Sequence, residues 1–328
     1  MRATKWLERL LDQAPLILFA GVLLWFGSRT PGFLTATNLL NVGTQAAPGG
    51  VVAIGMTLVL LTAGVDLSVG SLMFVAAAVA GKLALSGQPM VIVLAAMLAV
   101  GLAGGAVNAW LVARAGIAPF VATLALLFVG RGFALWLTQT RAMNLPESFL
   151  EIGATKVAGM PLPLVVLLGG AVLAHGFLMR TAAGRQIYAV GHGRAAAAKA
   201  GINVNRLLTI VYVSSAICAV IGAVLALGQL GAVTPKFGEN YEFKAISAAV
   251  LGGTSLFGGR GRVLPGTLFG VLLVQLVENG LVLGNVDPYL YPLATSAVIF
   301  AAVLLDSARD GWRRRSQRRL IFNPTPQP

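Results

Sequence analysis

Few side chains in this sequence are of types that perform chemistry. The chain has one cysteine, Cys218, within an apolar run, and a lone thiol supports neither a disulfide framework nor a metal cluster. Its two histidines, His175 and His192, are too few and too far apart for a zinc site. Since no His, Asp and Glu cluster accompanies a nucleophile, the sequence predicts neither catalytic residues nor a bound metal.

Residues 187–196 contain a misleading nucleotide-binding pattern. They read I-Y-A-V-G-H-G-R-A-A, which matches a strand followed by G-x-G-x-x-A. That fingerprint needs an acidic residue about 20 positions later within an α/β unit, whereas 206–228 hold no acid and have the composition of a membrane span. The Walker sequence G-x-x-x-x-G-K-[ST] does not occur either. We therefore expect the chain to bind no cofactor itself.

The first distinctive polar residue is Asp66, in the run A-G-V-D-L-S-V-G-S at 63–71. A carboxylate between two membrane spans is costly unless its oxygens are satisfied. Asp66 or Ser68 can cap the N–H groups that open the next helix, with the glycines allowing a tight break. The alternative function for Asp66 is direct contact with a solute or a gate.

Two ionisable residues, Arg131 and Glu278, fall well inside apolar segments. Each lies about 20 Å above the expected cytoplasmic start of its helix, at a rise of 1.5 Å per residue. Unpaired charges at this depth are costly, so we expect both to face the interior of the bundle. They either pair with each other or line a polar path with Gln275 and Asn279; otherwise Arg131 extends alone toward the interface.

The composition identifies the solvent that surrounds these residues. Of 328 residues, 57% are hydrophobic and 11% are charged, and the mean hydropathy is +0.83. A soluble domain carries about 25% charged residues, so this surface must mostly face lipid. With about 20 apolar residues per span, the sequence predicts spans near 15–28, 47–63, 70–86, 89–113, 118–138, 162–179, 206–228, 244–257, 264–283 and 289–305.

The basic residues predict the orientation of these segments. Most of the 24 lysines and arginines fall on one side of a ten-span arrangement, mainly in 1–15, 180–206 and 306–328. That side is the cytoplasm by the positive-inside rule, so we expect both termini there. The net charge of +13 is then explained by loops that touch anionic lipid and not by nucleic-acid binding. The predicted organisation is a cytoplasmic N-terminus at 1–14, a transmembrane domain at 15–305 and a basic tail at 306–328.

The longest polar loop on the inner side is 180–206. Within it, the alanine-rich run 194–200 has high helix propensity, and Gly201 suits the C-terminal stop. Asn205 is placed to cap the following span. A short, stiff cytoplasmic helix between two spans is a lever on which a soluble motor subunit can push, although the same pattern also fits an ordinary connecting helix.

A second glycine-rich stretch, 245–262, reads A-I-S-A-A-V-L-G-G-T-S-L-F-G-G-R-G-R. Its two glycine pairs interrupt an apolar run, which predicts non-helical backbone near membrane depth. Such backbone is tolerated only where protein or a wet cavity covers it. The expected fold is therefore an all-α integral membrane bundle of about ten helices with a broken-helix core.

Several runs, taken in order, resemble the permease family of bacterial ABC importers for monosaccharides, of the ribose and xylose type. The resemblance covers roughly 47–306. It is carried by A-G-V-D-L-S-V-G-S at 63–71, P-F-V-A-T-L at 119–124 with Arg131-Gly132, Gly184-Arg185 through Gly201-Ile202, Tyr241-Glu242 through L-G-G-T-S-L at 251–256, and G-G-R-G at 258–261.

The resemblance implies a non-enzymatic transport subunit in the bacterial inner membrane. Its implied partners are a second permease copy or a paralogue, a cytoplasmic ATPase that uses ATP, and a periplasmic sugar-binding protein. The implied ATPase-docking residues lie in 191–202: Gly191, Arg194, Ala196, Ala197, Lys199 and Gly201. The chain departs from the family at Arg194 and Ala195, where glutamates are usual, and at Lys244, where an acid is usual.

The sequence thus predicts the permease subunit of an ATP-driven importer for a pentose or hexose. The candidate path residues are Asp66, Arg131, Gln275, Glu278 and Asn279. A branched-chain amino-acid permease is the nearest alternative. An ion-coupled secondary transporter is another, and it would need the Arg131 and Glu278 pair as its titratable group.

Overall fold

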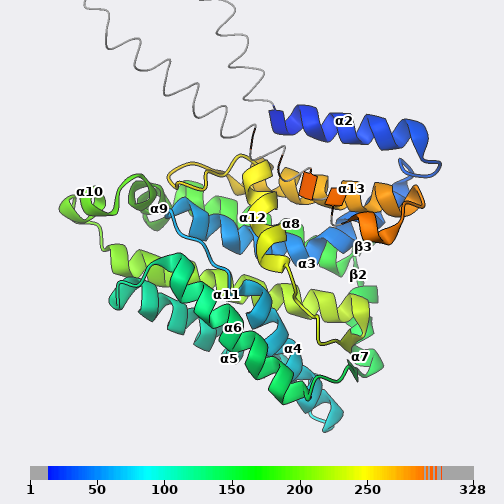
Figure 1. The fold of residues 1–328 in the computed structure, drawn as a ribbon, viewed down its shortest axis with the longest axis horizontal. Coiled ribbons are helices and arrows are strands. Elements are labelled where there is room, and N and C mark those ends of the chain that lie inside the picture. Colours follow the sequence, from blue (N-terminus) through cyan, green and yellow to red (C-terminus); the bar gives the residue numbers. More distant parts are fainter. Residues whose placement is uncertain (1–13, 292, 295, 298–299, 301–303, 305–328) are drawn as a thin grey trace, which may run out of the picture.

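The computed structural model describes residues 14–291 together with 293–294, 296–297, 300 and 304. Its architecture is helical, with four two-residue strands confined to loops (Figure 1). Six helical stretches in this part of the chain are long and apolar enough to cross a membrane. They are Ala36–Leu61, Met90–Arg114, Pro119–Thr138, Leu162–Arg180, Val204–Leu230 and Val263–Leu283, and the apolar helix Val69–Leu85 is shorter.

The helices follow one another as α2 (Ala14–Arg29), α3 (Ala36–Leu61), α4 (Val69–Leu85), α5 (Met90–Ala109), α6 (Pro119–Thr138), α7 (Glu147–Ala154), α8 (Leu162–Arg180), α9 (Ala182–His192), α10 (Arg194–Lys199), α11 (Val204–Leu230), α12 (Tyr241–Leu251) and α13 (Leu268–Leu283). The π-helical turn η1 (Trp110–Arg114) extends α5, η2 (Val263–Thr267) opens α13, and the 3₁₀ turn η3 (Pro288–Leu290) follows it. The N-terminus at 1–13, the tail at 306–328 and positions 292, 295, 298–299, 301–303 and 305 of the predicted span 289–305 lie outside the described residues.

Helix α3 differs most from its predicted bounds, because it begins at Ala36 and not at 47. Thr35 caps its N-terminus by accepting a hydrogen bond from the Asn38 N–H. The first three turns carry polar side chains, so hydropathy alone excludes them from a span. Asn38, Asn41 and Gln45 nevertheless recur at intervals of three and four residues, which is the helical period.

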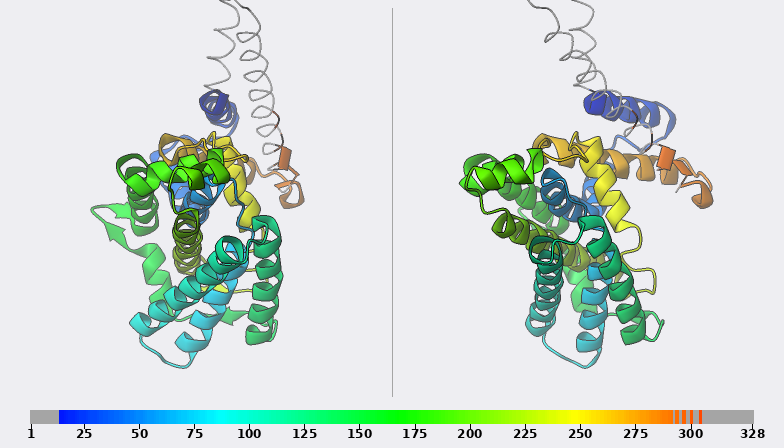
Figure 2. Two further views of the ribbon diagram at one scale, coloured as in Figure 1. Left: turned by 90° about the vertical axis from the view of Figure 1, so that its left-hand side faces the viewer. Right: turned by 60° about the vertical axis from the view of Figure 1, so that its left-hand side comes forward.

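Helices α3 and α11 form the centre of the fold. Gly55 lets their backbones approach closely, because a Cβ there would lie 2.9 Å from the Cα of Ser215 and 2.8 Å from the Cβ of Cys218. Small residues at such a crossing are typical of helices packed in lipid. Figure 2 shows α4, α5 and α6 grouped to one side of this centre, with α2 on the opposite side.

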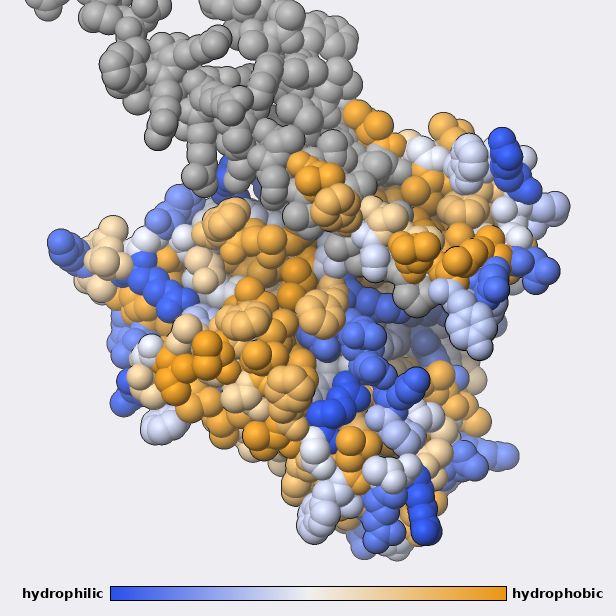
Figure 3. Space-filling view, in the orientation of Figure 1, coloured by the Kyte–Doolittle hydropathy of each residue, from blue (hydrophilic) through white to orange (hydrophobic). Residues whose placement is uncertain are grey.

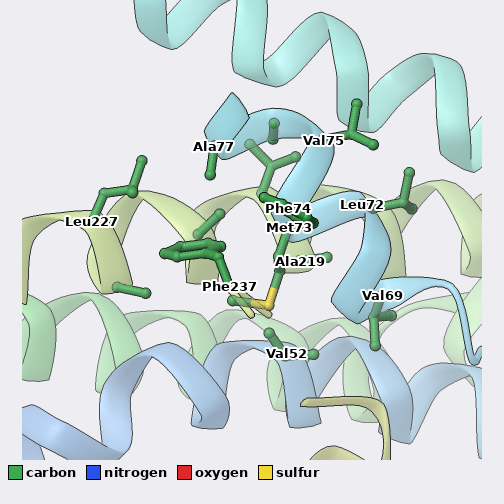
Figure 4. Close-up of a cluster of buried hydrophobic side chains, with 14 of the residues drawn as sticks. Val52, Val69, Leu72, Met73, Phe74, Val75, Ala77, Ala219, Leu227 and Phe237 are labelled. Atoms are coloured by element: carbon green, nitrogen blue, oxygen red, sulfur yellow. The ribbon is translucent and has the colours of Figure 1, made fainter. Parts of the chain in front are cut away.

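Helix α4 begins inside the core. Figure 4 shows Met73 and Phe74 of α4 packed near Phe237, with Val52 of α3 and Ala219 of α11 close by. Met73 and Phe74 are fully buried and Phe237 is 4% exposed. The start of α4 is therefore enclosed by protein, so a polar group there must find its partners within the bundle.

The predicted break in the glycine-rich stretch is confirmed. Helix α12 ends at Leu251, and helical structure resumes only at η2. A Cβ on Gly252 would meet the backbone of Gly266, and one on Gly270 would meet the backbone of Ala248. Because neither glycine has a side chain, the irregular segment and the end of α12 pack directly against the backbone of η2 and α13.

Short strands tie together the loops at the opposite end from α9 and α10. Strand β1 (Met143–Asn144) pairs antiparallel with β4 (Ala232–Val233), and β2 (Lys156–Val157) pairs with β3 (Met160–Pro161). In Figure 3, apolar side chains cover much of the visible surface, and hydrophilic ones gather in a hollow beside α12. Broad apolar exposure suits lipid, and the hollow is where a polar solute can be accommodated.

Candidate functional site

A cavity of about 630 Å³ lies between α3, α12 and α13. Three predicted path residues, Gln275, Glu278 and Asn279, line it. They stand on one face of α13 because residues three and four apart in a helix are neighbours. Gln45 of α3 and Lys244 of α12 complete much of its polar wall.

Amide groups join α3 to α13 at this cavity. Asn38 Nδ2 donates to Asn279 Oδ1 at 2.8 Å, and Asn279 Nδ2 donates back to Asn38 Oδ1 at 3.1 Å. Gln275 Nε2 donates to Gln45 Oε1 at 3.3 Å. The wall therefore offers both donors and acceptors, which are the groups that orient a hydroxylated ligand.

Glu278 forms an ion pair with Lys244, whose Nζ lies 2.7 Å from Glu278 Oε1. The hypothesis that Glu278 pairs with Arg131 is wrong, because Lys244 from the neighbouring helix α12 takes that position. The Lys244 and Glu278 side chains are 44% and 23% exposed. A partly solvated pair of this kind leaves the cavity wall close to neutral.

Arg131 lies on α6 with different partners. Its Nη1 donates to the Phe237 carbonyl oxygen at 2.9 Å, and its guanidinium carbon lies 5.3 Å from the centre of the Phe74 ring. These contacts satisfy the cation within the protein, as the cost of an unpaired charge requires. They also tie the loop before α12 to α4 and α6.

Asp66 is fully buried at the start of α4. Its Oδ1 accepts from the Ser68 N–H at 3.0 Å and the Ser68 hydroxyl at 2.6 Å, and from Asn108 Nδ2 at 3.4 Å. Its Oδ2 accepts from the Ser215 hydroxyl at 2.9 Å. Asp66 thus bonds the N–H of Ser68, the residue just ahead of α4, but no side chain caps the first N–H groups of the helix itself, so the predicted cap is not formed. Asp66 instead links the start of α4 to α5 and α11.

Beside this network, the hydroxyl of Tyr212 on α11 is buried and has no hydrogen-bond partner among the described residues. It faces the glycine turn before Asp66, since a Cβ on Gly64 would lie 2.8 Å from the phenol oxygen. The described part of the chain holds no group of three or more His, Cys, Asp or Glu side chains that could bind a metal ion.

The predicted docking segment forms α9 and α10. The strand that the dinucleotide fingerprint would need is helix α9, which supports rejecting that interpretation. In α10, Ala197 is 4% exposed and packs inward, while Ala196 and Lys199 are exposed. Gly201, with φ +81°, ends α10 as predicted. The cap of α11 is Asn203, whose side chain accepts from the Arg206 N–H, so the prediction of Asn205 is wrong.

The docking segment contacts the end of α3 and the glycine-rich stretch. Gly191 lies so close to Leu61 and Gly259 that any Cβ would overlap both backbones, and the Gly259 N–H donates to the Leu61 carbonyl at 3.0 Å. Arg194 Nη2 approaches the Thr62 carbonyl at 3.4 Å. Gly191 and Arg194 therefore face the membrane domain.

Tyr188 adds another link from α9, since its hydroxyl donates to the Gly261 carbonyl at 3.0 Å. Partial burial raises the pKa of the Tyr188 phenol, an effect that the nearby Arg262 charge opposes. The phenol therefore stays protonated at neutral pH and remains a donor.

Sequence reasoning missed Asn38, Gln45 and Lys244. The first two lie ahead of the predicted span at 47, where their helical spacing was the available signal. Lys244 departs from the resembled family and begins the predicted span 244–257, but nothing in the sequence predicts its partner. Its partner lies 34 positions further along the chain, and only the crossing of α12 and α13 brings the two together.

Comparison with known proteins gives consistent matches. Residues 38–306 match the model of the family described as "Branched-chain amino acid transport system / permease component". The chain is 37% identical to the ribose import permease protein RbsC of Escherichia coli K12 over 306 residues, 92% of this chain and 95% of that protein.

Two further relatives cover similar lengths. RbsC of Bacillus subtilis 168 is 36% identical over 84% of this chain and 86% of its own. The D-allose transport system permease protein AlsC of E. coli K12 is 34% identical over 86% and 87%. No solved structure matches the chain.

Proposed function

The chain belongs to the family of branched-chain amino acid transport system permease components, and from this premise we propose that it is the membrane-spanning permease subunit of an ATP-driven importer for a simple sugar. The observation that carries the sugar assignment is the polar cavity beside α12. Its amides and its closed ion pair present donors and acceptors without a net charge, which suits a neutral pentose or hexose. The relatives named for ribose and allose support the same class.

In this proposal Gln275, Glu278 and Asn279 contact the solute as it passes. Asp66 and Arg131 contribute to the path by holding its walls, because both are tied to neighbouring helices. The permease alternates between outward-open and inward-open states that the solute and the motor bias differently.

The driving force comes from partners. An ATPase docks from the cytoplasm on the solvent-exposed face of α9 and α10, where Ala196 and Lys199 are exposed. ATP binds only to that partner. Arg194 faces Thr62, so the absence of a glutamate at 194 changes a contact inside the permease more than the contact with the ATPase. A second permease copy or a paralogue completes the pore, and a periplasmic binding protein delivers the sugar to the outer loops.

We further propose that the chain forms about ten membrane helices within 15–305 in a bacterial inner membrane. The docking loop at 180–206 and the termini at 1–14 and 306–328 lie in the cytoplasm, and the basic tail contacts anionic lipid. A C218S chain carrying one new cysteine tests the orientation. An impermeant maleimide should label S86C from outside intact cells and K199C only after lysis. The reverse pattern would contradict the orientation.

One observation favours an amino acid as the transported solute instead. The ammonium of Lys244 and the carboxylate of Glu278 can exchange their mutual contact for the carboxylate and ammonium of a zwitterion. The family description also names branched-chain amino acids.

Proteoliposomes distinguish these solutes and the secondary-transporter alternative. The permease is reconstituted with its ATPase and binding protein, and uptake of labelled ribose, allose and leucine is measured with and without internal and external ATP. We expect sugar uptake only with ATP and the ATPase. Leucine uptake would favour the amino-acid permease, and uptake driven by a proton or sodium gradient without the ATPase would overturn the proposal.

A further inference from the structure

Glu242 is a buried acid that the proposed path does not use. It lies in the first turn of α12 and is 5% exposed. Its Oε2 is buried without a hydrogen-bond partner among the described residues. Burying an uncompensated carboxylate is costly, so the ionisation of Glu242 depends on the groups that surround it.

Two helix N-termini converge on this carboxylate. Glu242 belongs to the first turn of α12, and its Oε2 lies against Gly70 in the first turn of α4, where any Cβ would overlap it. Figure 1 shows the start of α12 next to the start of α4. The N-terminus of a helix carries a partial positive charge that favours an anion. The missing side chain at Gly70 leaves room for the Glu242 carboxylate there.

Arg131 supplies a full positive charge from a third helix. Burial raises the pKa of the Glu242 carboxyl. The bond from its own backbone N–H and the charge of Arg131 oppose that shift, and the nearby Glu239 weakly reinforces it. Arg131 also donates to the Phe237 carbonyl, and Gly238 packs against the Gly70 backbone. The segment 237–242 is therefore fixed on α4 and α6 just before α12 begins.

Helix α12 connects this fixed point to both functional regions. Two residues after Glu242, Lys244 reaches the cavity and pairs with Glu278. Beyond the other end of α12, Gly259 and Gly261 bond to Leu61 of α3 and Tyr188 of α9. A displacement of the docking segment thus acts on one end of α12, while Glu242 holds the other.

We propose that Glu242 is a positioning residue for transport. Glu242 is held between the N-termini of α4 and α12 and near the charge of Arg131, and it fixes the N-terminal end of α12. Movement of the docking segment therefore turns α12 about this point and shifts Lys244 in the cavity. The inference rests on the proposed transport function.

The test compares E242Q, which removes the charge and keeps the shape, with E239Q, a matched change at a nearby exposed acid. Each variant is reconstituted with the ATPase and binding protein. We expect E242Q to co-purify with the ATPase at the wild-type ratio, with a KM for sugar raised at least about fivefold and a similar loss of solute-stimulated ATP hydrolysis. E242D should recover part of both, and E239Q should match the wild type.

A merely structural role would lower Vmax through loss of active protein and leave KM unchanged, and that result overturns the inference. If E242Q does not accumulate, R131Q decides by the same readouts: a raised KM with intact assembly supports the inference, and an unchanged KM overturns it. Wild-type sugar uptake is measured first. If it is absent, the proposed function fails; if it is present and E242Q matches it, only the role of Glu242 fails.

Discussion

The link between Asp66 and Ser215 provides the most direct test of what holds the centre of the bundle. S215A removes one hydroxyl and leaves the rest of α11 unchanged. Both residues are fully buried, and the Ser215 hydroxyl lies 2.9 Å from Asp66 Oδ2. The three other donors to this carboxylate all reach Oδ1, so within the described chain Ser215 is the donor that serves Oδ2.

The expected loss follows from that geometry. A hydrogen bond to a charged group contributes about 1.5–3 kcal/mol, and no water replaces it readily at a fully buried site. S215A should lower the free energy of unfolding by about that amount. S86A is the control, because the Ser86 hydroxyl is exposed and donates only to the Leu83 carbonyl, and its effect should stay within about 0.5 kcal/mol.

Equilibrium unfolding in mixed micelles, followed by circular dichroism over an SDS titration, measures both changes. A double-mutant cycle with D66A assigns the energy, because the cost of S215A should largely disappear once the carboxylate is gone. An S215A variant as stable as S86A, or a cost that persists unchanged in the D66A background, would refute the account of Asp66 as the link between α4 and α11.

Three other predictions concern packing, the cavity and the docking segment. G55A should cost about 1–3 kcal/mol because its methyl overlaps α11, whereas G132A, with nothing within 4 Å, should be neutral or stabilising by up to about 1 kcal/mol in the same titration. K244E should abolish uptake and the swap K244E/E278K should restore part of it, whereas a swap as inactive as K244E would contradict the pairing. The coupling free energy between Lys244 and Glu278, measured by unfolding, should be about 0.2–1 kcal/mol because both side chains are partly solvated. Y188F should weaken solute-stimulated ATP hydrolysis by up to about tenfold, because it removes a hydrogen bond that contributes about 0.5–1.5 kcal/mol. Burial raises the pKa of Tyr188, so solute-stimulated ATP hydrolysis by the wild type should not lose this bond between neutral pH and about pH 9.

The local signals in the sequence predicted the helices and their breaks better than the contacts between them. Gly201 and the glycine pairs after Leu251 act through backbone geometry, which a sequence displays directly. The start of α3 was missed because hydropathy cannot detect a helix whose polar face meets another polar face. Asn38 is such a case, since its partner Asn279 is distant in sequence and adjacent only in the fold.

The charged residues illustrate the same limit. Equal depth made Arg131 and Glu278 plausible partners, yet depth fixes only one coordinate of a side chain. The rotation of α6 and α13 about their axes decides the pairing, and it follows from close glycine contacts such as that of Gly270 with Ala248. Arg131 consequently meets the Phe237 carbonyl, and Glu278 meets Lys244.

The break after Leu251 has a mechanical consequence for the proposed cycle. In a continuous helix from α12 into α13, Lys244 and Glu278 would lie about 51 Å apart at a rise of 1.5 Å per residue and could not form a pair. Because the chain reverses through the irregular segment 252–262, α12 and α13 lie side by side and carry opposite members of the pair. The reversal itself contacts α9 through Tyr188 and α3 through Leu61. Force applied at the docking segment therefore reaches the point where the two cavity walls can separate.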